Sequence, residues 1–469
     1  MHDVIAQIAD YVENTHIQSE EAFETARLCL ADSLGCAVLA LCFPDCTRLL
    51  GPIVPGTVVP HGSRVPGTDY ILDPVTAAFN IGTMIRWLDF NDTWLAKEWG
   101  HPSDNIGGIL SVADYLSRKA LKEGRPSITV FDALKAIIKA YEIQGSLAMN
   151  NSYNRIGLDH VIFVKIATAA VVAEMLGANQ KQIADAVSQA WLDNSPLRTY
   201  RHAGSTGFRK SWAAGDATMR GVQFAWMTLL GEQGYPQALT ASQWGVNDVL
   251  FKEAPLSLPD KMSSYVMENI LFKVAFPAEF HAQTAIECAI KLHPQIRHRL
   301  DEIKEITIET QESAMRIIDK KGPLKNPADR DHCLQYMVAA ALFFGELKAE
   351  HYQDEAAKQP QIDRLRDKMH IVENEKFSSD YINPSLRSIA NAIIIEFQDG
   401  SKTERIAIEF PLGHRKRRQE AIPLVLQKCE TNLKTCFHKD KTASIMQLFE
   451  DHHRLETWPV ALFSDLFHK

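Results

Sequence analysis

The chain has 469 residues, of which 46% are hydrophobic and 23% are charged. This length exceeds what one ordinary hydrophobic core organises, so we expect two domains. Its 58 acidic side chains outnumber the 50 basic ones, which gives a net charge of −8. That balance excludes binding to nucleic acid through overall positive charge, and an anionic ligand would need a local cluster of cations.

The sequence carries no motif for a membrane segment, a secretion signal or a cofactor. No run approaches the roughly 18 apolar residues of a membrane helix, and the first fourteen residues are charged and lack an apolar core. The eight cysteines include no Cys-x-x-Cys pair, and zinc-helix, phosphate-loop and dinucleotide motifs are missing. We therefore expect a cytoplasmic protein with no membrane contact, no metal and no cofactor.

Apolar residues recur with a helical period through most of residues 1–270. The predicted helices cover residues 22–41, 76–87, 106–117, 130–149, 161–176, 180–192, 213–230 and 243–251. A Pro-rich connection at 42–60 leaves short strand pieces possible. We expect these helices to form one large helical domain.

The pattern changes near residue 270. Residues 302–310 alternate as a strand with Ile306 and Ile308 on one face, and an Asp399-Gly400 turn between two alternating runs indicates a β-hairpin. Helices are expected between them at 278–292, 330–344 and 355–366. We predict an α+β domain at 271–411, and a helical domain of residues 1–270 that residues 412–469 complete.

One polar stretch, residues 86–105, lies between two apolar helices. It holds Asp89, Thr93 and His101, and it ends at Ser103-Asp-Asn105, which are good residues to cap a helix. The start of a helix offers free N–H groups and a positive dipole end to a carboxylate or phosphate. His101 should be neutral there, which suits proton transfer near neutral pH. The competing interpretation is that this stretch is only a turn whose side chains pack in the core.

The amino-acid sequence of this stretch resembles the signature of a known family. Asp89-Phe-Asn-Asp-Thr-Trp followed by Gly100-His-Pro-Ser-Asp-Asn is similar to the signature of the MmgE/PrpD family, and further matches run along nearly the whole chain. The resemblance is strongest to its bacterial 2-methylcitrate-dehydrating branch. It implies a mainly α fold with an inserted α+β lid domain, a homodimer, and removal of water from a tricarboxylate without a cofactor.

Two further clusters lie at predicted helix starts. Asp159-His160 opens one helix, where a plain cap is the simpler interpretation; by resemblance, His160 occupies the place of an active-site histidine. The loop 195–216 carries Arg198, Arg201, His202, Arg209 and Lys210 with no acid before Asp216, and arginine suits bidentate carboxylate binding. By resemblance, Lys210 matches a catalytic-site lysine.

The remaining candidates lie near the change of domain. Lys273 to His281 contains a proline suited to the first turn of a helix, which would carry Glu279 and His281. The family places a lysine and a histidine here, and whether Glu279 or His281 takes the histidine's role stays open. Arg330 and Tyr336 open another helix, where Tyr336 resembles a recurrent family tyrosine.

These observations lead to one hypothesis: a metal-independent hydro-lyase that converts 2-methylcitrate to 2-methyl-cis-aconitate in propionate catabolism. His101, oriented by Asp89, would move the proton at carbon; Lys210 and Lys273 would hold carboxylates; His160, His281 or Tyr336 would protonate the leaving hydroxyl. The predicted substrate-binding residues are Thr93, Ser103, Arg201, Arg209, Glu279 and Arg330.

Three alternatives remain. Within the family, a cis-aconitate decarboxylase would use the same cations, and a related isomerase or epimerase would also move a proton next to a carboxylate. Citrate and cis-aconitate are possible additional substrates. From another class, a non-enzymatic interaction protein would use the same helical scaffold, although the polar clusters at helix starts favour anion binding.

Overall fold

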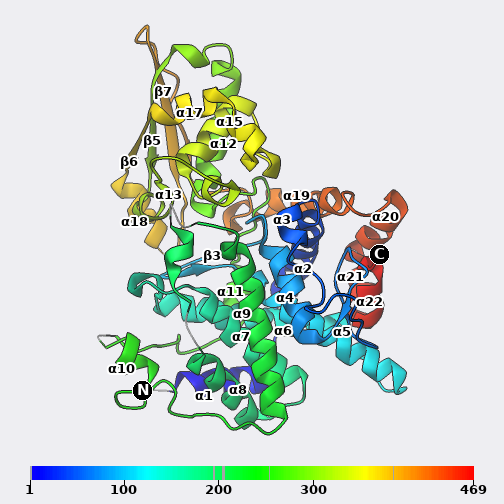
Figure 1. The fold of residues 1–469 in the computed structure, drawn as a ribbon. Helices are drawn as coiled ribbons and strands as arrows, with labels where there is room; N and C mark the ends of the chain where they lie inside the picture. The colour runs from blue at the N-terminus through cyan, green and yellow to red at the C-terminus, as the bar shows by residue number, and fades with distance from the viewer. Residues whose placement is uncertain (1–2, 194–195, 203–205, 253, 384) are drawn as a thin grey trace.

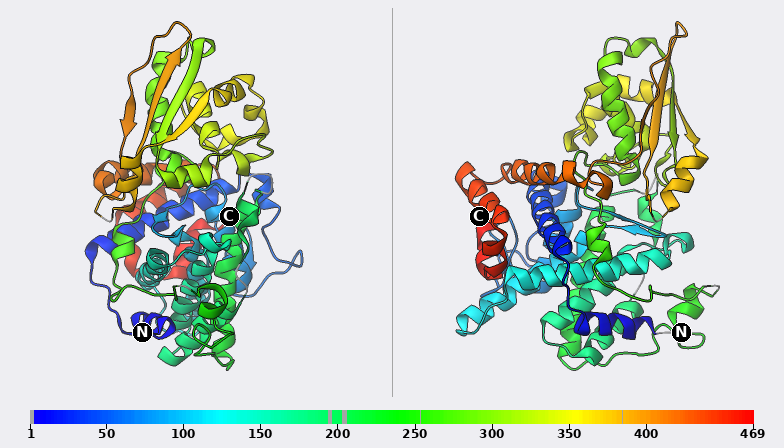
Figure 2. Two further views of the ribbon diagram at one scale, coloured as in Figure 1. Left: turned by 90° about the vertical axis from the view of Figure 1, so that its left-hand side faces the viewer. Right: turned by 180° about the vertical axis from the view of Figure 1, so that it is seen from behind.

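The computed structural model describes residues 3–193, 196–202, 206–252, 254–383 and 385–469. The described chain is mainly helical, with one four-stranded sheet and two two-stranded ladders (Figure 1). Both chain ends lie in the helical part, away from the larger sheet (Figure 2). A search of the described residues found no helix that is long and apolar enough to span a membrane.

The helical part begins with a series of helices that covers most of the first 270 residues. They are α1 (Val4–Asn14), α2 (Glu20–Ala40), α3 (Pro44–Thr47), α4 (Pro74–Arg86), α5 (Ile106–Lys122), α6 (Val130–Asn150), α7 (Val161–Met175), α8 (Gln180–Leu192), α9 (Arg209–Leu229), α10 (Val246–Leu250) and α11 (Tyr265–Glu268). The two small ladders pair β1 (Ser63–Arg64) with β2 (Ile71–Leu72), and β3 (Trp94–Leu95) with β4 (Trp99–Gly100).

Helix α7 lies at the centre of this part. Residues 161–173 are all buried, because α6, α8 and α9 pack around it. A helix that is apolar on every side needs such surroundings. Helix α9 also packs closely on α4: a side-chain carbon at Gly215 would lie 2.3 Å from Thr83 Oγ1. The glycine therefore lets the start of α9 approach the end of α4, where the polar stretch begins.

The C-terminal helices return to the helical part. They are α19 (Arg418–Leu433), α20 (Lys439–Glu450), α21 (His452–Thr457) and α22 (Val460–Phe467). Helix α19 packs on α2 and α22 packs on α5. Their apolar residues join one large hydrophobic cluster that also contains residues from Val4 to Val274.

The remaining segment builds a mixed sheet covered by helices. The sheet has the order β6 (Met369–Glu373), β5 (Ile303–Thr310), β7 (Asn391–Phe397), β8 (Ile406–Ile408); β5 runs parallel to β6 and antiparallel to β7. The helices of this part are α12 (Gln283–Ile296), α13 (Glu312–Ile318), α14 (Pro327–Arg330), α15 (Leu334–Phe344), α16 (Asp354–Ala357), α17 (Pro360–Asp367) and α18 (Glu375–Ile382). A second hydrophobic cluster, from Ala278 to Phe397, belongs to it.

The prediction of a mainly helical chain is confirmed, and so is the hairpin of β7 and β8, in which Ile393 pairs with Ile406. Several details were wrong. Strand pieces lie at 63–72 rather than at 42–60, the helix predicted at 243–251 covers only Val246–Leu250, and residues 355–366 form two helices, with Pro360 starting the second. The predicted domain limits at 270 and 411 stay a prediction.

Candidate active site

The polar stretch between α4 and α5 folds into the β3–β4 hairpin. Asp89 lies just after α4 and has a backbone φ of 50°, a left-handed conformation that few residues other than glycine adopt. Thr93 exchanges two backbone hydrogen bonds with Leu271, which lies two residues before Lys273. This pairing brings Lys273 to Asp89 across 184 positions of sequence.

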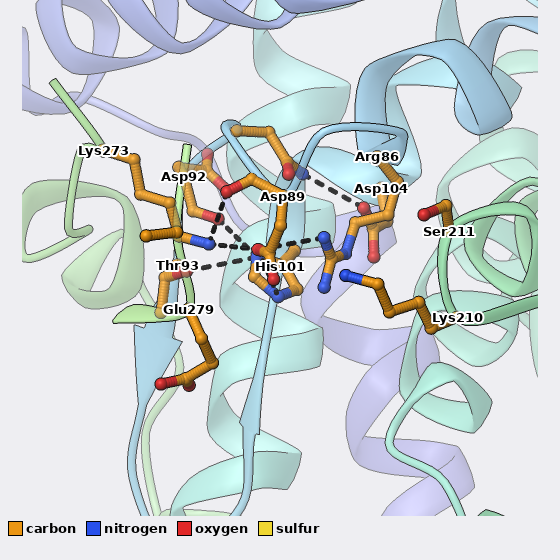
Figure 3. Close-up of polar contacts among 12 residues, drawn as sticks. Arg86, Asp89, Asp92, Thr93, His101, Asp104, Lys210, Ser211, Lys273 and Glu279 are labelled. Atoms are coloured by element: carbon orange, nitrogen blue, oxygen red, sulfur yellow. Dashed lines mark hydrogen bonds and ion pairs between the residues drawn. The ribbon is translucent and has the colours of Figure 1, made fainter. Parts of the chain in front are cut away.

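Two cations and a histidine surround the Asp89 carboxylate. The Lys273 ammonium group donates to it, Arg86 Nη1 lies 2.9 Å from Oδ1, and His332 Nε2 lies 3.5 Å from Oδ2. Figure 3 shows Arg86, Lys273 and His101 converging on Asp89. Burial alone would raise the pKa of Asp89, but the charges of Arg86 and Lys273 outweigh it and hold the pKa well below its usual range.

His101 is buried beside this carboxylate. Its Nδ1 lies 2.7 Å from the Asp92 carbonyl oxygen and 3.1 Å from Thr93 Oγ1, and its Nε2 lies 3.8 Å from Asp89 Oδ1. A carbonyl only accepts hydrogen bonds, so we infer that Nδ1 carries the proton and Nε2 keeps its lone pair. Burial, helped by the charges of Arg86 and Lys273, lowers the pKa of His101 well below its ordinary value, so the ring is neutral.

His160 approaches from the start of α7. Its ring centroid lies 6.1 Å from that of His101, and neither of its buried ring nitrogens has a hydrogen-bond partner in the described part of the chain. Burial lowers the pKa of His160 well below its ordinary value. Behind it, Arg201 makes a two-point ion pair with Asp159, and Arg198 Nη1 lies 3.6 Å from the same carboxylate.

These groups line one pocket of about 680 Å³, including space open to solvent. Five cations line it against two carboxylates, which leaves a surplus of three positive charges when the histidines are neutral. The cations are Arg86, Arg198, Arg201, Lys273 and Arg316, and the carboxylates are Asp89 and Glu279. In an acidic chain, such a surplus indicates a site for a small polyanion.

Two family models match the chain. A model of the MmgE/PrpD N-terminal domain matches residues 6–259, and a model of the MmgE/PrpD C-terminal domain matches residues 276–452. The chain belongs to the MmgE/PrpD family.

Curated relatives in this family match over nearly the full chain. The chain is 55% identical to a 2-methylcitrate dehydratase of Escherichia coli (strain K12), with 99% of this chain and 96% of that protein covered. Identity is 53% to the 2-methylcitrate dehydratase of Cupriavidus necator, with the same coverage. The mitochondrial 2-methylcitrate dehydratase of Yarrowia lipolytica is 54% identical over 94% of this chain and 86% of that protein.

The structure brings seven of the residues predicted for an MmgE/PrpD site together in the pocket. They are Asp89, Thr93, His101, His160, Arg201, Lys273 and Glu279. Their roles remain proposals. Loop residues 194, 195 and 203–205, part of the basic cluster, lie outside the described residues.

Lys210 is placed beside the pocket rather than in its lining. Its Nζ donates to both Asp331 carboxylate oxygens, at 2.6 and 2.8 Å, and lies 3.2 Å from His332 Nδ1. Helix α9 starts earlier than predicted, at Arg209, and its first turn directs Lys210 toward the α+β part. Direct binding of a substrate carboxylate by Lys210 stays a prediction. The lysine contacts His332, which does line the pocket.

Glu279 and His281 take different positions relative to the pocket. Glu279 lines the pocket, whereas His281 is fully buried behind it, with Nδ1 2.8 Å from Glu279 Oε1 and Nε2 3.1 Å from the Tyr381 hydroxyl. The predicted helix start at 278 was wrong, because Glu279 caps a short 3-10 turn at Phe280–Ala282 and α12 begins only at Gln283. Protonation of a leaving group by His281 stays a prediction.

Tyr336 and Arg330 point into the α+β part. The Tyr336 hydroxyl donates to the His351 carbonyl oxygen at 2.7 Å, and Arg330 Nη1 donates to the Tyr352 carbonyl oxygen at 2.7 Å. Both side chains therefore serve local structure, and neither lines the described pocket. Their contact with substrate stays a prediction.

Ser103 and Arg209 also lie outside the pocket lining. The Ser103 hydroxyl and N–H donate to Asp92 Oδ1 at 2.7 and 3.2 Å, so a side chain of the protein takes the place predicted for a ligand anion. The exposed Arg209 guanidinium stacks on Trp212, 4.3 Å from its ring centroid. The substrate contacts of both residues stay predictions.

Five charged or histidine residues that line the pocket were not among the predicted site residues: Arg86, Arg198, His202, Arg316 and His332. Arg86 and Arg198 stood inside the two polar clusters that were singled out, and His332 follows directly on Asp331 in the stretch that was quoted around Tyr336. Their charge and position were signals that could have found them. Arg316, in the short helix α13, stands in no such cluster, and only the fold brings it to the pocket.

Proposed function

We propose that this chain removes water from 2-methylcitrate to give 2-methyl-cis-aconitate, as a step of propionate breakdown. The observation that carries the proposal is a neutral His101, with Nε2 free to accept a proton, in a pocket lined by more cations than carboxylates, which suits a tricarboxylate. The names of the full-length relatives support the choice of substrate.

The charges of the pocket suit carboxylate binding. Arg198 Nη1 is buried and makes no hydrogen bond to any described residue, so it is available to a ligand. Arg201 is held rigidly by Asp159, which leaves little side-chain freedom to lose on binding. Arg316 adds a cation from the α+β part. Arginine offers carboxylates a planar pair of donors, which fixes the orientation of the substrate.

The two histidines divide the proton transfers. His101 Nε2 takes the proton from the carbon next to a carboxylate, the electron pair forms the double bond, and the bond to the hydroxyl on the neighbouring carbon breaks. His160 gives a proton to the departing oxygen, which leaves as water. The negative charges of the bound substrate oppose the cations around His160 and favour its protonated form. Nearby cations stabilise charge that develops on the carboxylate.

A turnover assay tests this function. Chain treated with chelator is mixed in turn with 2-methylcitrate, citrate and cis-aconitate, while absorbance of the new double bond and released carbon dioxide are followed. The proposal expects unsaturated product from 2-methylcitrate without carbon dioxide. Carbon dioxide from cis-aconitate would indicate the decarboxylase instead, and activity lost with the chelator would show a metal requirement. No turnover of any substrate would contradict the proposal and favour the isomerase or the non-enzymatic protein.

A variant assigns the base. His101→Asn keeps a group that can donate to the Asp92 carbonyl oxygen but removes the basic Nε2, so kcat should fall by about 10²- to 10⁴-fold. His438→Asn, at an exposed position, is the matched control and should keep wild-type kcat. Wild-type turnover by His101→Asn would remove His101 from the mechanism.

We further infer that the α+β part, residues 271–411, closes as a lid over the helical part, and that the chain forms a homodimer in the cytoplasm. The pocket supports the lid, because Arg316 and His332 of the α+β part line it together with His101 and His160. Limited proteolysis tests the predicted boundaries at 270 and 411, and light scattering tests the dimer. A monomer in solution would contradict the dimer.

A further inference from the structure

A second, larger cavity adjoins the pocket of His101. This outer cavity measures about 1270 Å³, including space open to solvent, and it shares Leu95, Trp99 and Arg316 with the pocket. Its walls come from the β3–β4 hairpin and α11 below, and from α13 and α18 above (Figure 1). The outer cavity therefore lies between the helical part and the α+β part, next to the candidate active site.

The outer cavity is strongly positive. Four cations line it, Lys97, Arg155, Arg316 and Arg387, against the single carboxylate of Glu312. Among the described residues, only Arg316 of these four has an ion-pair partner, with its Nε 3.7 Å from Glu312. Acidic side chains outnumber basic ones over the whole chain, so this local excess is not explained by composition. A hollow lined by charges of one sign concentrates ligands of the opposite sign.

Arg316 and Trp99 join the two cavities. The Arg316 guanidinium carbon lies 5.7 Å from the Trp99 ring centroid, and that of Arg198, inside the pocket, lies 5.3 Å from the same centroid. Two guanidinium groups thus flank one aromatic ring at the junction. Lys97 and Arg155 line the outer cavity, Arg316 lines both cavities, and Arg198 lines the pocket. An anion that moves inward from Lys97 or Arg155 would therefore remain close to cations until it reaches the buried histidines.

We propose that the outer cavity is an antechamber that captures the polyanionic carboxylate substrate and passes it through Arg316 to the pocket. This proposal rests on the proposed function, because it takes the same substrate class. Lys97 and Arg155 act on the approach alone, since neither lines the described pocket. Their removal slows both entry and exit and leaves the bound complex unchanged.

Stopped-flow mixing with propane-1,2,3-tricarboxylate as the probe, a tricarboxylate with no hydroxyl group to lose, is followed by tryptophan fluorescence and measures entry without turnover. In the double variant Lys97→Ala/Arg155→Ala, the association rate constant should fall on the order of 10-fold at low salt, because steering by charge contributes at least that much. The equilibrium Kd should change less than twofold. With 2-methylcitrate, kcat at saturation should stay at the wild-type value. Near 1 M salt, charges are screened within about 3 Å, so the association rate constants of the wild type and the variant should become equal.

The matched control removes two cations elsewhere. Lys119→Ala/Lys122→Ala changes two exposed lysines at the end of α5 and should leave the association rate as in wild type. An equal loss in this control would assign the effect to net charge and overturn the antechamber. Wild-type association in Lys97→Ala/Arg155→Ala would also overturn it, while turnover of 2-methylcitrate would leave the proposed function standing. A chain that binds no tricarboxylate would overturn both.

Discussion

At the scale of single residues, burial can change the protonation of a side chain. Glu98 in the β3–β4 hairpin is a case in which this change can be measured. It has no exposed surface, accepts hydrogen bonds from the N–H groups of Asn154 and Trp99, and burial raises its pKa from 4.5 to about 7. The folded chain therefore keeps a proton between these two pH values that the unfolded chain releases. Stability contributed by Glu98 is present below about pH 4.5 and is lost as pH rises toward 7, by roughly 3 kcal/mol.

Glu98→Gln removes this titration. Between pH 5 and 8 the variant should gain stability relative to wild type, and the difference in Tm between the two chains should shift in favour of the variant as pH rises. Thermal unfolding at a series of pH values measures it. Glu24→Gln, at an exposed helix position, is the control and should follow wild type. A pH-independent difference for Glu98→Gln would contradict the assigned proton.

At the scale of elements, helix α19 holds the site together from the far end of the chain. Lys428 Nζ donates to the carbonyl oxygens of Phe90 at 2.6 Å and of Lys273 at 2.7 Å, and it pairs with Asp32 of α2 at 2.8 Å. The two carbonyls belong to the segments that carry Asp89 and Lys273. Lys428→Met leaves the Asp32 charge buried and unpaired, so stability should fall by about 3–5 kcal/mol, measured as a lower Tm.

A double variant separates stability from positioning. Asp32→Leu/Lys428→Met removes both buried charges and should recover much of the lost Tm. It should not recover kcat, because the carbonyls next to Asp89 and at Lys273 still lack their shared donor. Lys434→Met, half exposed at the end of the same helix, should leave both quantities as in wild type. Full kcat in Asp32→Leu/Lys428→Met would show that Lys428 stabilises without positioning.

Elements that the local sequence determines could be predicted, whereas elements that depend on partners far away in the sequence could not. Helix α8 begins and ends where its apolar period predicts, and Asp89, Thr93 and His101 share one short stretch. Strand β6 has only five residues, is half exposed, and pairs in parallel with a strand some sixty residues earlier, so its local pattern is too short to indicate it. The direction of Lys210 depends on Asp331, 121 positions away.

For the whole molecule, the pocket matters because the helical part and the α+β part both supply its walls. Arg316 and His332 come from the α+β part, and His101 and His160 come from the helical part. A ligand that contacts both sides opposes any opening that separates them. Bound at 100 times its Kd, it adds about 2.7 kcal/mol to the free energy of such an opening. The ligand adds nothing to the free energy of openings that leave the pocket intact.

Hydrogen exchange with citrate as the ligand tests this coupling between the two parts. Citrate should slow amide exchange in α13 and around His332 as well as around His101, because each of these segments opens only when the pocket comes apart. Arg316→Ala removes the contact from α13, so citrate should still protect the segment around His101 but protect α13 less. Protection confined to the helical part in the wild-type chain would contradict closure, because the α+β part would then open and close without regard to the anion beneath it.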